Sequence, residues 1–232
     1  ENGKMTHQKE NAPEWSDEIK ERVFHSFHRK PITVEDLKLK ETTGTHQRVI
    51  DMVAHELITK ERIEEWKELP NVAPGVDTDR DIVKLAAIER HKNTGHVGLG
   101  FLGRYGLKRG AVATSIGHDS HNLVIAGVTD EDMAAAGNRV IENGGGLAIA
   151  LDGKILADLP LPIGGLMADE PVEAVDEKLE QMKALSTKLG ISEDIDAFMT
   201  LAFISLPVIP KLRLNTYGVI DVDKHEVVKA RF

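Results

Sequence analysis

Apolar residues recur every three or four positions in the clearest periodic stretch of the chain. They are Val172, Val175, Leu179, Met182, Leu185 and Leu189. Pro171 opens this stretch and Gly190 ends it, as at the two ends of a helix. We therefore predict an amphipathic helix that buries one face, with Leu179, Met182 and Leu185 as its docking stripe.

Two further stretches predict helices. Thr129 with Asp132 three residues later forms a capping box, so a helix is expected to run to Ile141, where three consecutive glycines follow shortly and end it. Another helix is expected over about 195–206, because Pro207 stops it.

Short apolar and β-branched runs predict the strands. These runs cover residues 47–58, 81–88, 123–128, 147–151, 154–159, 219–222 and 227–230. The dipeptide Asp152-Gly153 separates two of them and favours the positive φ angles of a type I′ turn. We expect a β-hairpin there.

Residues 95–117 break the pattern, since they carry seven glycines. That number is too large for a regular helix, and the stretch has few apolar neighbours for a central strand. We predict a closely packed or mobile loop region.

The first 45 residues are polar, with Trp15, Phe24 and Phe27 as isolated aromatic anchors. Ser16 followed by two acidic residues is typical of a helix start, but the alternation from Val23 to Phe27 also fits a strand, and both alternatives stay open.

The whole pattern predicts an α+β fold with a mostly antiparallel or mixed sheet and two to three packed helices. We place this domain at 45–232, behind an N-terminal arm at 1–44.

Charge and composition exclude several classes of protein. The chain has 38 acidic and 29 basic residues and a net charge of -9, which disfavours general nucleic-acid binding. Its lack of cysteine excludes disulfides, a cysteine nucleophile and a thiolate zinc site, and fits a reducing cytoplasm. Polar residues interrupt the longest apolar stretch, 199–209, so we expect no membrane span.

The densest polar cluster follows the glycine-rich region and precedes an apolar run. It consists of His118, Asp119, Ser120, His121 and Asn122. Two imidazoles and a carboxylate are able to bind a metal, position a water or hydrogen-bond a heterocycle, so we take His118, Asp119 and His121 as catalytic candidates. The alternative is a structural turn in which Asp119 and Asn122 bond the backbone. A complete metal site would need ligands from elsewhere in the chain.

Arg90 and His91 form a second candidate, at the end of a predicted strand. Arg90 is able to clamp a carboxylate or stack on a flat ring, and the alternative is a surface charge pair. We expect these residues to meet the first cluster in one polar pocket. Arg90, His91, Ser120 and Asn122 are accordingly candidates for binding substrate or positioning a loop.

Several catalytic motifs are absent from the sequence. Glycines 98, 100 and 103 match the letters G-x-G-x-x-G, but no helix start follows them, which argues against dinucleotide binding. No G-x-S-x-G nucleophile elbow and no H-x-H pair occurs. The chain therefore does not carry a complete metal-dependent hydrolase barrel.

Seven blocks of sequence, taken in order, resemble the C-terminal domain of bacterial adenine deaminases over about residues 45–223. They are Asp81-Ile-Val-Lys84; Ile88-Glu-Arg-His91; Gly98-Leu-Gly-Phe101; Gly106-Leu-Lys-Arg-Gly110; His118-Asp-Ser-His-Asn122; Leu159-Pro-Leu-Pro-Ile163 with Gly165-Leu-Met167; and Phe198-Met-Thr-Leu201 with Leu206-Pro-Val-Ile-Pro210. Ala168, Lys211 and Asn215-Thr216 depart from the residues usual in that family. These departures concern local contacts at the C-terminal end.

The resemblance implies a portion of a larger enzyme of the amidohydrolase superfamily. Members hydrolyse adenine to hypoxanthine and ammonia on a (β/α)₈ barrel that holds manganese or iron and precedes this domain. It implies that the partners are this barrel and a purine, in a cytoplasmic homo-oligomer, and that this chain binds no cofactor and is inactive alone. The arm would be the tail of the barrel or of its small β-domain, and Glu1 would mark either a cut or a chain whose start lies further upstream.

Three functions from different classes follow. The first is an accessory domain of adenine deaminase, the second is a stand-alone binding or structural module with the same fold, and the third is a small metal hydrolase using His118, Asp119 and His121.

Overall fold

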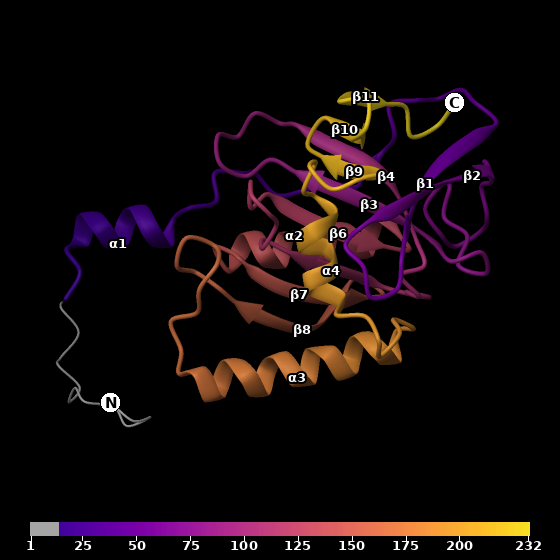
Figure 1. Cartoon of the computed structure of the whole chain (residues 1–232). Coiled ribbons are helices and arrows are strands. Elements are labelled where there is room, and N and C mark those ends of the chain that lie inside the picture. Colours follow the sequence, from indigo (N-terminus) through magenta and orange to yellow (C-terminus); the bar gives the residue numbers. More distant parts are fainter. Residues whose placement is uncertain (1–13) are drawn as a thin grey trace, which may run out of the picture.

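A computed structural model describes residues 14–232 of the chain (Figure 1). In chain order its elements are α1 (Asp17–Phe24), the short 3₁₀ helix η1 (Glu35–Leu37), β1 (His46–Met52), β2 (Thr59–Glu65), β3 (Ile82–Ile88), β4 (Val97–Gly103), β5 (Ala111–Thr114), β6 (Leu123–Gly127), α2 (Asp130–Glu142), β7 (Gly146–Leu151), β8 (Lys154–Pro160), α3 (Val172–Lys188), α4 (Ala197–Ile204), β9 (Leu212–Asn215), β10 (Gly218–Asp221) and β11 (Glu226–Val228). The predicted α+β class is confirmed.

Eight strands form one mixed sheet in the order β2-β1-β4-β3-β6-β5-β7-β8. Every neighbouring pair is antiparallel except β1 and β4, which run parallel. The last three strands form a separate antiparallel sheet in the order β11-β10-β9. The prediction of a mixed sheet is therefore correct.

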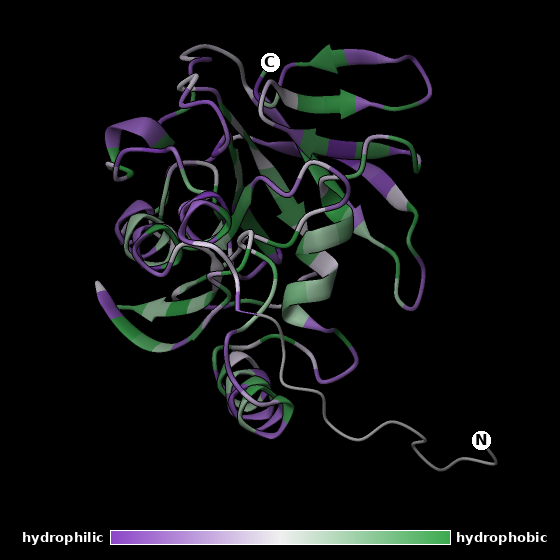
Figure 2. Ribbon diagram, turned by 90° about the vertical axis from the view of Figure 1, so that its left-hand side faces the viewer, coloured by the Kyte–Doolittle hydropathy of each residue, from purple (hydrophilic) through white to green (hydrophobic). Residues whose placement is uncertain are grey.

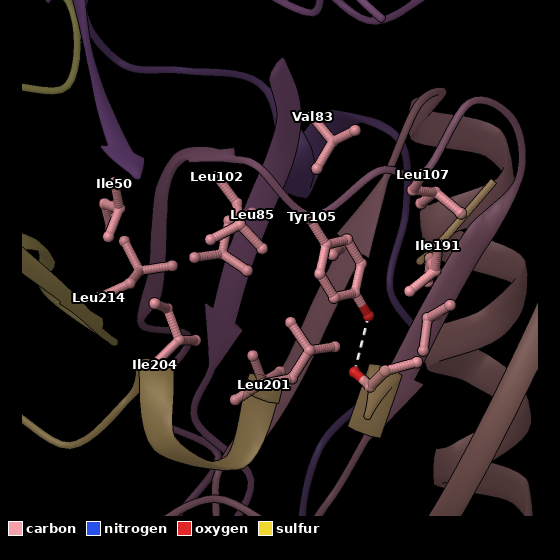
Figure 3. Packing of buried hydrophobic residues seen from close by; sticks show 14 of the residues in the cluster. Ile50, Val83, Leu85, Leu102, Tyr105, Leu107, Ile191, Leu201, Ile204 and Leu214 are labelled. Atoms are coloured by element: carbon pink, nitrogen blue, oxygen red, sulfur yellow. Dashed lines mark hydrogen bonds between the residues drawn. The ribbon is translucent and has the colours of Figure 1, made fainter. Parts of the chain in front are cut away.

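The central strands are mostly apolar because both faces of the large sheet are covered, and the buried Lys84 of β3 pairs with Asp130 of α2 at 2.6 Å. Successive residues of β6 alternate between the two hydrophobic clusters: Ile125 packs with Met133 and Val140 of α2, whereas Val124 packs in the cluster of α4 and the small sheet. On that second face the hydroxyl of Tyr105 donates a hydrogen bond to the carbonyl of Ala197 over 2.7 Å, and the fully buried ring lies among aliphatic side chains (Figure 3). This bond fixes the start of α4.

Three local signals in the sequence produce the predicted elements. The hydroxyl of Thr129 accepts a hydrogen bond from the backbone N–H of Asp132 and caps α2. Asp152 and Gly153 have φ angles of 53° and 70°, and β7 and β8 form the expected hairpin around them. The helix expected over 195–206 is α4, and the closing strands expected at 219–222 and 227–230 are β10 and β11.

The prediction of a loop over 95–117 is wrong, because this stretch contains strands β4 and β5. Its glycines make the close packing possible. A Cβ atom on Gly98 would lie 1.9 Å from the carbonyl oxygen of Asn215, and one on Gly100 would lie 2.9 Å from Val219. The missing side chains let the small sheet lie directly against β4.

The prediction of one strand over 47–58 is also wrong. Strand β1 ends at Met52, and the strand that follows, β2, was not predicted because its sequence is mostly charged. β2 is an edge strand whose charges pair across to β1, with Arg48 Nε 2.8 Å from Glu61 and Arg62 Nε 2.9 Å from Asp51.

The element left open near Ser16 is helix α1, since the Ser16 hydroxyl accepts the N–H of Ile19 and caps it. Figure 1 shows α1 standing away from the body of the molecule. Further along the proposed arm, Ile32 and Leu37 are buried against α2, where Asn138 bonds the N–H and carbonyl of Ile32 at 2.6 and 2.9 Å. The first thirteen residues of that arm lie outside the described residues.

Helix α3 forms as predicted, but its apolar stripe is only partly covered. Met182 is 1% exposed, whereas Leu179 and Leu185 are half-buried and Val172 is 73% exposed. The docking stripe is thus buried only at Met182, and a fully buried Leu179 is not what the structure shows. Figure 2 shows hydrophilic and hydrophobic residues around α3, while α4 is hydrophobic over most of its length.

Within residues 14–232, no helix combines the length and apolar character needed to cross a membrane.

Candidate functional site

The candidate cluster lies in the connection between β5 and β6, where the chain leaves one buried strand and enters the next. Ser115 anchors its start, because its hydroxyl donates to the carbonyl of Gly165 over 2.6 Å and accepts the N–H of Gly146 over 2.7 Å. The connection therefore begins from a rigid, fully bonded residue.

The two histidines of the cluster fold back on the chain. The backbone N–H of His118 donates to Ala202 of α4 over 2.9 Å, and its ring packs on Phe203 with centroids 4.5 Å apart. Nδ1 of His121 accepts the N–H of Gly117 at 3.3 Å, and the two imidazole centroids lie 6.1 Å apart. Within the cluster itself, the imidazole of His121 thus bonds the backbone of the turn.

Arg90 ties four segments together, and we call this arrangement the Arg90 junction. Its guanidinium donates from Nε to the carbonyl of His121 at 2.5 Å, from one terminal nitrogen to Ser26 at 3.1 and 3.3 Å, and from the other to the carbonyl of Gly164 at 3.0 Å. It also stacks over the ring of Phe27 at 4.5 Å. The residue is 2% exposed, and burial lowers its pKa to about 10, which leaves it charged at neutral pH.

His91 and Glu89 hold the other side of the turn. The ring Nε2 of His91 lies 2.7 Å from the carbonyl of Ser120. Burial acts to raise the pKa of Glu89, but its carboxylate accepts the N–H groups of Thr94, Lys92 and His91, and these bonds bring the pKa down to about 2. The segment after β3 is thereby locked next to the candidate cluster.

The structure therefore brings the two sequence candidates together, as expected, but through backbone atoms. Arg90 and His91 reach the carbonyls of His121 and Ser120, so their polar groups are used within the chain. Asp119 and Ser120 are exposed. The Oδ1 of Asn122 is buried and has no partner among the described residues.

The electrostatics favour a neutral His121. Burial lowers the pKa of His121 from its usual value, and the nearby His118 and Arg90 lower it further. Because Nδ1 accepts the N–H of Gly117, the proton of the neutral ring is on Nε2. The ring is able to donate one hydrogen bond to a ligand at neutral pH.

The geometry of the cluster does not fit a metal centre. Among residues 14–232, no three His, Asp or Glu side chains gather as ligands of one ion. His118, Asp119 and His121 thus form no set of three ligands in this arrangement.

Sequence reasoning missed the partners that complete the site, namely Ser26, Phe27, Gly164 and Phe203. One signal was available. Gly164 and Gly165 both have positive φ angles, and a Cβ atom on Gly165 would lie 2.8 Å from a terminal nitrogen of Arg90. A glycine pair in a turn of this kind marks a close approach by a side chain from elsewhere.

Comparison with known proteins gives consistent results. The family of adenine deaminase C-terminal domains matches residues 56–226. The chain is 44% identical over 206 residues to adenine deaminase 2 of Carboxydothermus hydrogenoformans, covering 89% of this chain and 36% of that protein. It is 44% identical over 218 residues to adenine deaminase of Archaeoglobus fulgidus, covering 94% and 36%, and 43% identical over 198 residues to that of Brucella abortus, covering 85% and 33%. The chain spans about a third of the length of these relatives.

Proposed function

Because the chain belongs to the family of adenine deaminase C-terminal domains, we propose that it is the C-terminal accessory portion of an adenine deaminase. The observation that carries this proposal is the coverage: nearly all of this chain matches relatives of which it spans only about a third. The remaining two thirds of such an enzyme would precede α1.

The proposal divides the labour between two parts of one polypeptide. The preceding amidohydrolase barrel would hold manganese or iron, and the metal would activate the water that attacks C6 of adenine and releases ammonia. The described side chains here supply no set of metal ligands. The purine is the substrate in this proposal, and the enzyme is a cytoplasmic homo-oligomer.

The cluster from His118 to Asn122 would face the purine or steady a loop over it. A neutral His121 offers an Nε2–H donor that suits a ring nitrogen of a purine. Arg90 and His91 are positioning residues in this proposal, because they hold the carbonyls of residues 121 and 120.

The first experiment measures ammonia release from adenine in the presence of manganese or iron. The polypeptide that carries this chain behind its barrel is expected to release ammonia steadily, and the isolated chain is expected to release none. Steady release by the isolated chain would contradict the division of labour. No release by the longer polypeptide would contradict the deaminase and favour the stand-alone module.

The second experiment replaces His121 by Asn in the longer polypeptide, with His225→Asn as the matched control. Both histidines have a positive φ angle that Asn tolerates, and His225 is exposed and far along the chain from the cluster. We expect His121→Asn to lower kcat about tenfold or more, the loss of about one hydrogen bond in the transition state, with the Tm at neutral pH unchanged. Lost stability with an unchanged kcat in the folded enzyme would instead support a purely structural turn.

A further inference from the structure

The first half of helix α3 has an apolar face that the core covers only in part. The stripe is buried at Met182 in the second half, but Val175 and Leu179 are half-buried and Val172 is 73% exposed. An isolated amphipathic helix gains little stability from propensity alone, so a long apolar stripe is normally covered. The uncovered half of α3 is therefore a surface that requires an occupant.

A groove of about 420 Å³ runs beside this half of the helix, and we call it the α3 groove. Its walls are mainly apolar side chains of the large sheet, of the connections that follow β5 and β8, of α3 and of the start of α4, including Leu147, Ile116, Leu179 and Phe198. Met167, 60% exposed, stands at its rim. Exposed apolar surface gathered in one groove is typical of a protein interaction site.

The chain enters the domain next to this groove. The N–H of Gly164 donates to the carbonyl of Val23, the penultimate residue of α1, over 2.8 Å. The turn that Gly164 belongs to is closed by the bridge between Ile163 and Met167, and Leu166 and Met167 form part of the groove wall. The C-terminal end of α1 is thereby held beside the turn that forms part of the groove wall.

The charged residues lining the groove identify the kind of occupant. They are Glu170 and Asp196, both acidic, and Asp169 and Glu173 flank the start of α3 nearby. Two copies of this face packed together would oppose these carboxylates, which disfavours a symmetric contact between copies. An apolar segment flanked by Lys or Arg would complement both the groove and its rim.

We propose that the α3 groove is the docking site for the catalytic portion that precedes α1 in the longer polypeptide, through an apolar segment flanked by basic residues. This proposal rests on the proposed function, since it takes its occupant from the part of the enzyme outside this chain. The groove walls include Phe198 and Met199 of α4, the helix on which His118 packs, so an occupant there touches the element that supports the candidate cluster.

The test compares thiol labelling at two positions of nearly equal exposure. Val172→Cys lies at the groove and Val208→Cys lies after α4, and these valines are 73% and 70% exposed in this chain, which has no cysteine of its own. Val227→Cys on β11 is a second control, 56% exposed as Val. In the longer polypeptide we expect iodoacetamide to label the thiol of the Val172→Cys variant at least tenfold more slowly than the thiols of both controls.

Equal labelling rates at the three positions would overturn the proposal, because the groove would then be open. Protection that disappears on hundredfold dilution would identify a second copy as the occupant and would also overturn it. A photo-crosslinking benzoylphenylalanine in place of Val172 is expected to join a peptide that precedes α1 in the same polypeptide. Neither readout requires turnover of adenine, so a failure of the proposed activity is distinguishable from a failure of docking.

Discussion

The Arg90 junction and the α3 groove share the turn from Ile163 to Met167. They differ in how far their side chains are buried and bonded by other parts of the chain. On one side of the turn, Arg90 is 2% exposed and bonds carbonyls from three other segments. On the other side, Met167 and Val172 at the start of α3 are 60% and 73% exposed and present apolar surface to the solvent. Arg90 and His91 bond backbone carbonyls within the chain, whereas the surface of the groove is mainly apolar. Polar density alone therefore does not mark the surface that meets a partner.

The largest effect is expected from Arg90→Met, which removes the centre of the junction. It leaves the carbonyls of Ser26, His121 and Gly164 without their donor, so we expect the free energy of unfolding to fall by about 3 kcal/mol or more. Urea denaturation measures it. Arg109, an exposed arginine, is the control, and Arg109→Met is expected to change stability by less than about 0.5 kcal/mol. Equal losses of unfolding free energy in the two variants would show that the Arg90 junction does not stabilise the fold.

The next effect separates the two halves of α3. Met182→Ala is expected to cost about 2 to 5 kcal/mol, because Met182 is 1% exposed. Leu179→Ala is expected to cost about 1 kcal/mol or less in the isolated chain, since part of that side chain already faces solvent in the groove. Thermal and urea unfolding of both variants compare the losses. A larger loss for Leu179 would show that the groove is closed in solution.

A smaller effect concerns pH and the segment beside the junction. The pKa of Glu89 is lowered to about 2 when the chain is folded, from 4.5, so the unfolded chain binds its proton more readily. Its contribution to stability is complete above pH 4.5 and is lost as the pH falls toward 2. After solvent screening we expect about 1 kcal/mol. Glu89→Gln should flatten the stability profile in that window, and an unchanged slope would show that the carboxylate does not hold the segment.

The smallest effect comes from His121. Its pKa is lowered by burial, by His118 and by Arg90, so the unfolded chain takes up the proton first as the pH falls. The contribution to stability is present above pH 6.5 and decreases below it. We expect His121→Asn to make the fall in Tm between about pH 7 and pH 5 shallower, and His225→Asn to leave it unchanged. A profile identical to that of the parent chain would mean that the ring is solvated.

The elements that the sequence predicts correctly are those defined by local chemistry. Each of these elements is set by residues within a few positions of one another. Examples are the Thr129 cap, the Asp152-Gly153 turn and the helix start at Pro171. The glycines of β4 have a different cause. Gly98 is required because Asn215, distant in the sequence, lies against it, and no pattern within residues 95–117 carries that information.

The same distinction holds at the candidate site. The junction of Arg90 and His91 with residues 120 and 121 followed from the strand ends that were predicted correctly. The sequence did not predict that the partners of Arg90 and His91 are backbone carbonyls. A sequence does not show whether an arginine bonds a side chain or a main-chain oxygen. Leu179 shows a different limit. Its spacing correctly places it on the apolar face of α3, but the side chain is only half-buried here, and in our proposal the occupant of the α3 groove completes its burial.

One pairing in the large sheet bears on how the chain is made. Parallel strand β4 covers only residues 49–51 of its edge of β1, and the start of β1 bonds the last residues, with His46 and Phe232 exchanging N–H to carbonyl bonds of 2.9 Å and Arg48 N–H reaching Ala230 at 2.8 Å. Contacts at this seam span 181 and 187 residues. During synthesis from the N-terminus, the start of β1 therefore keeps an unpaired edge until residues 230–232 have left the ribosome, and open strand edges pair readily with other chains. A polypeptide truncated before residue 230 would therefore expose an unpaired edge of β1, which is able to pair with strands of other chains.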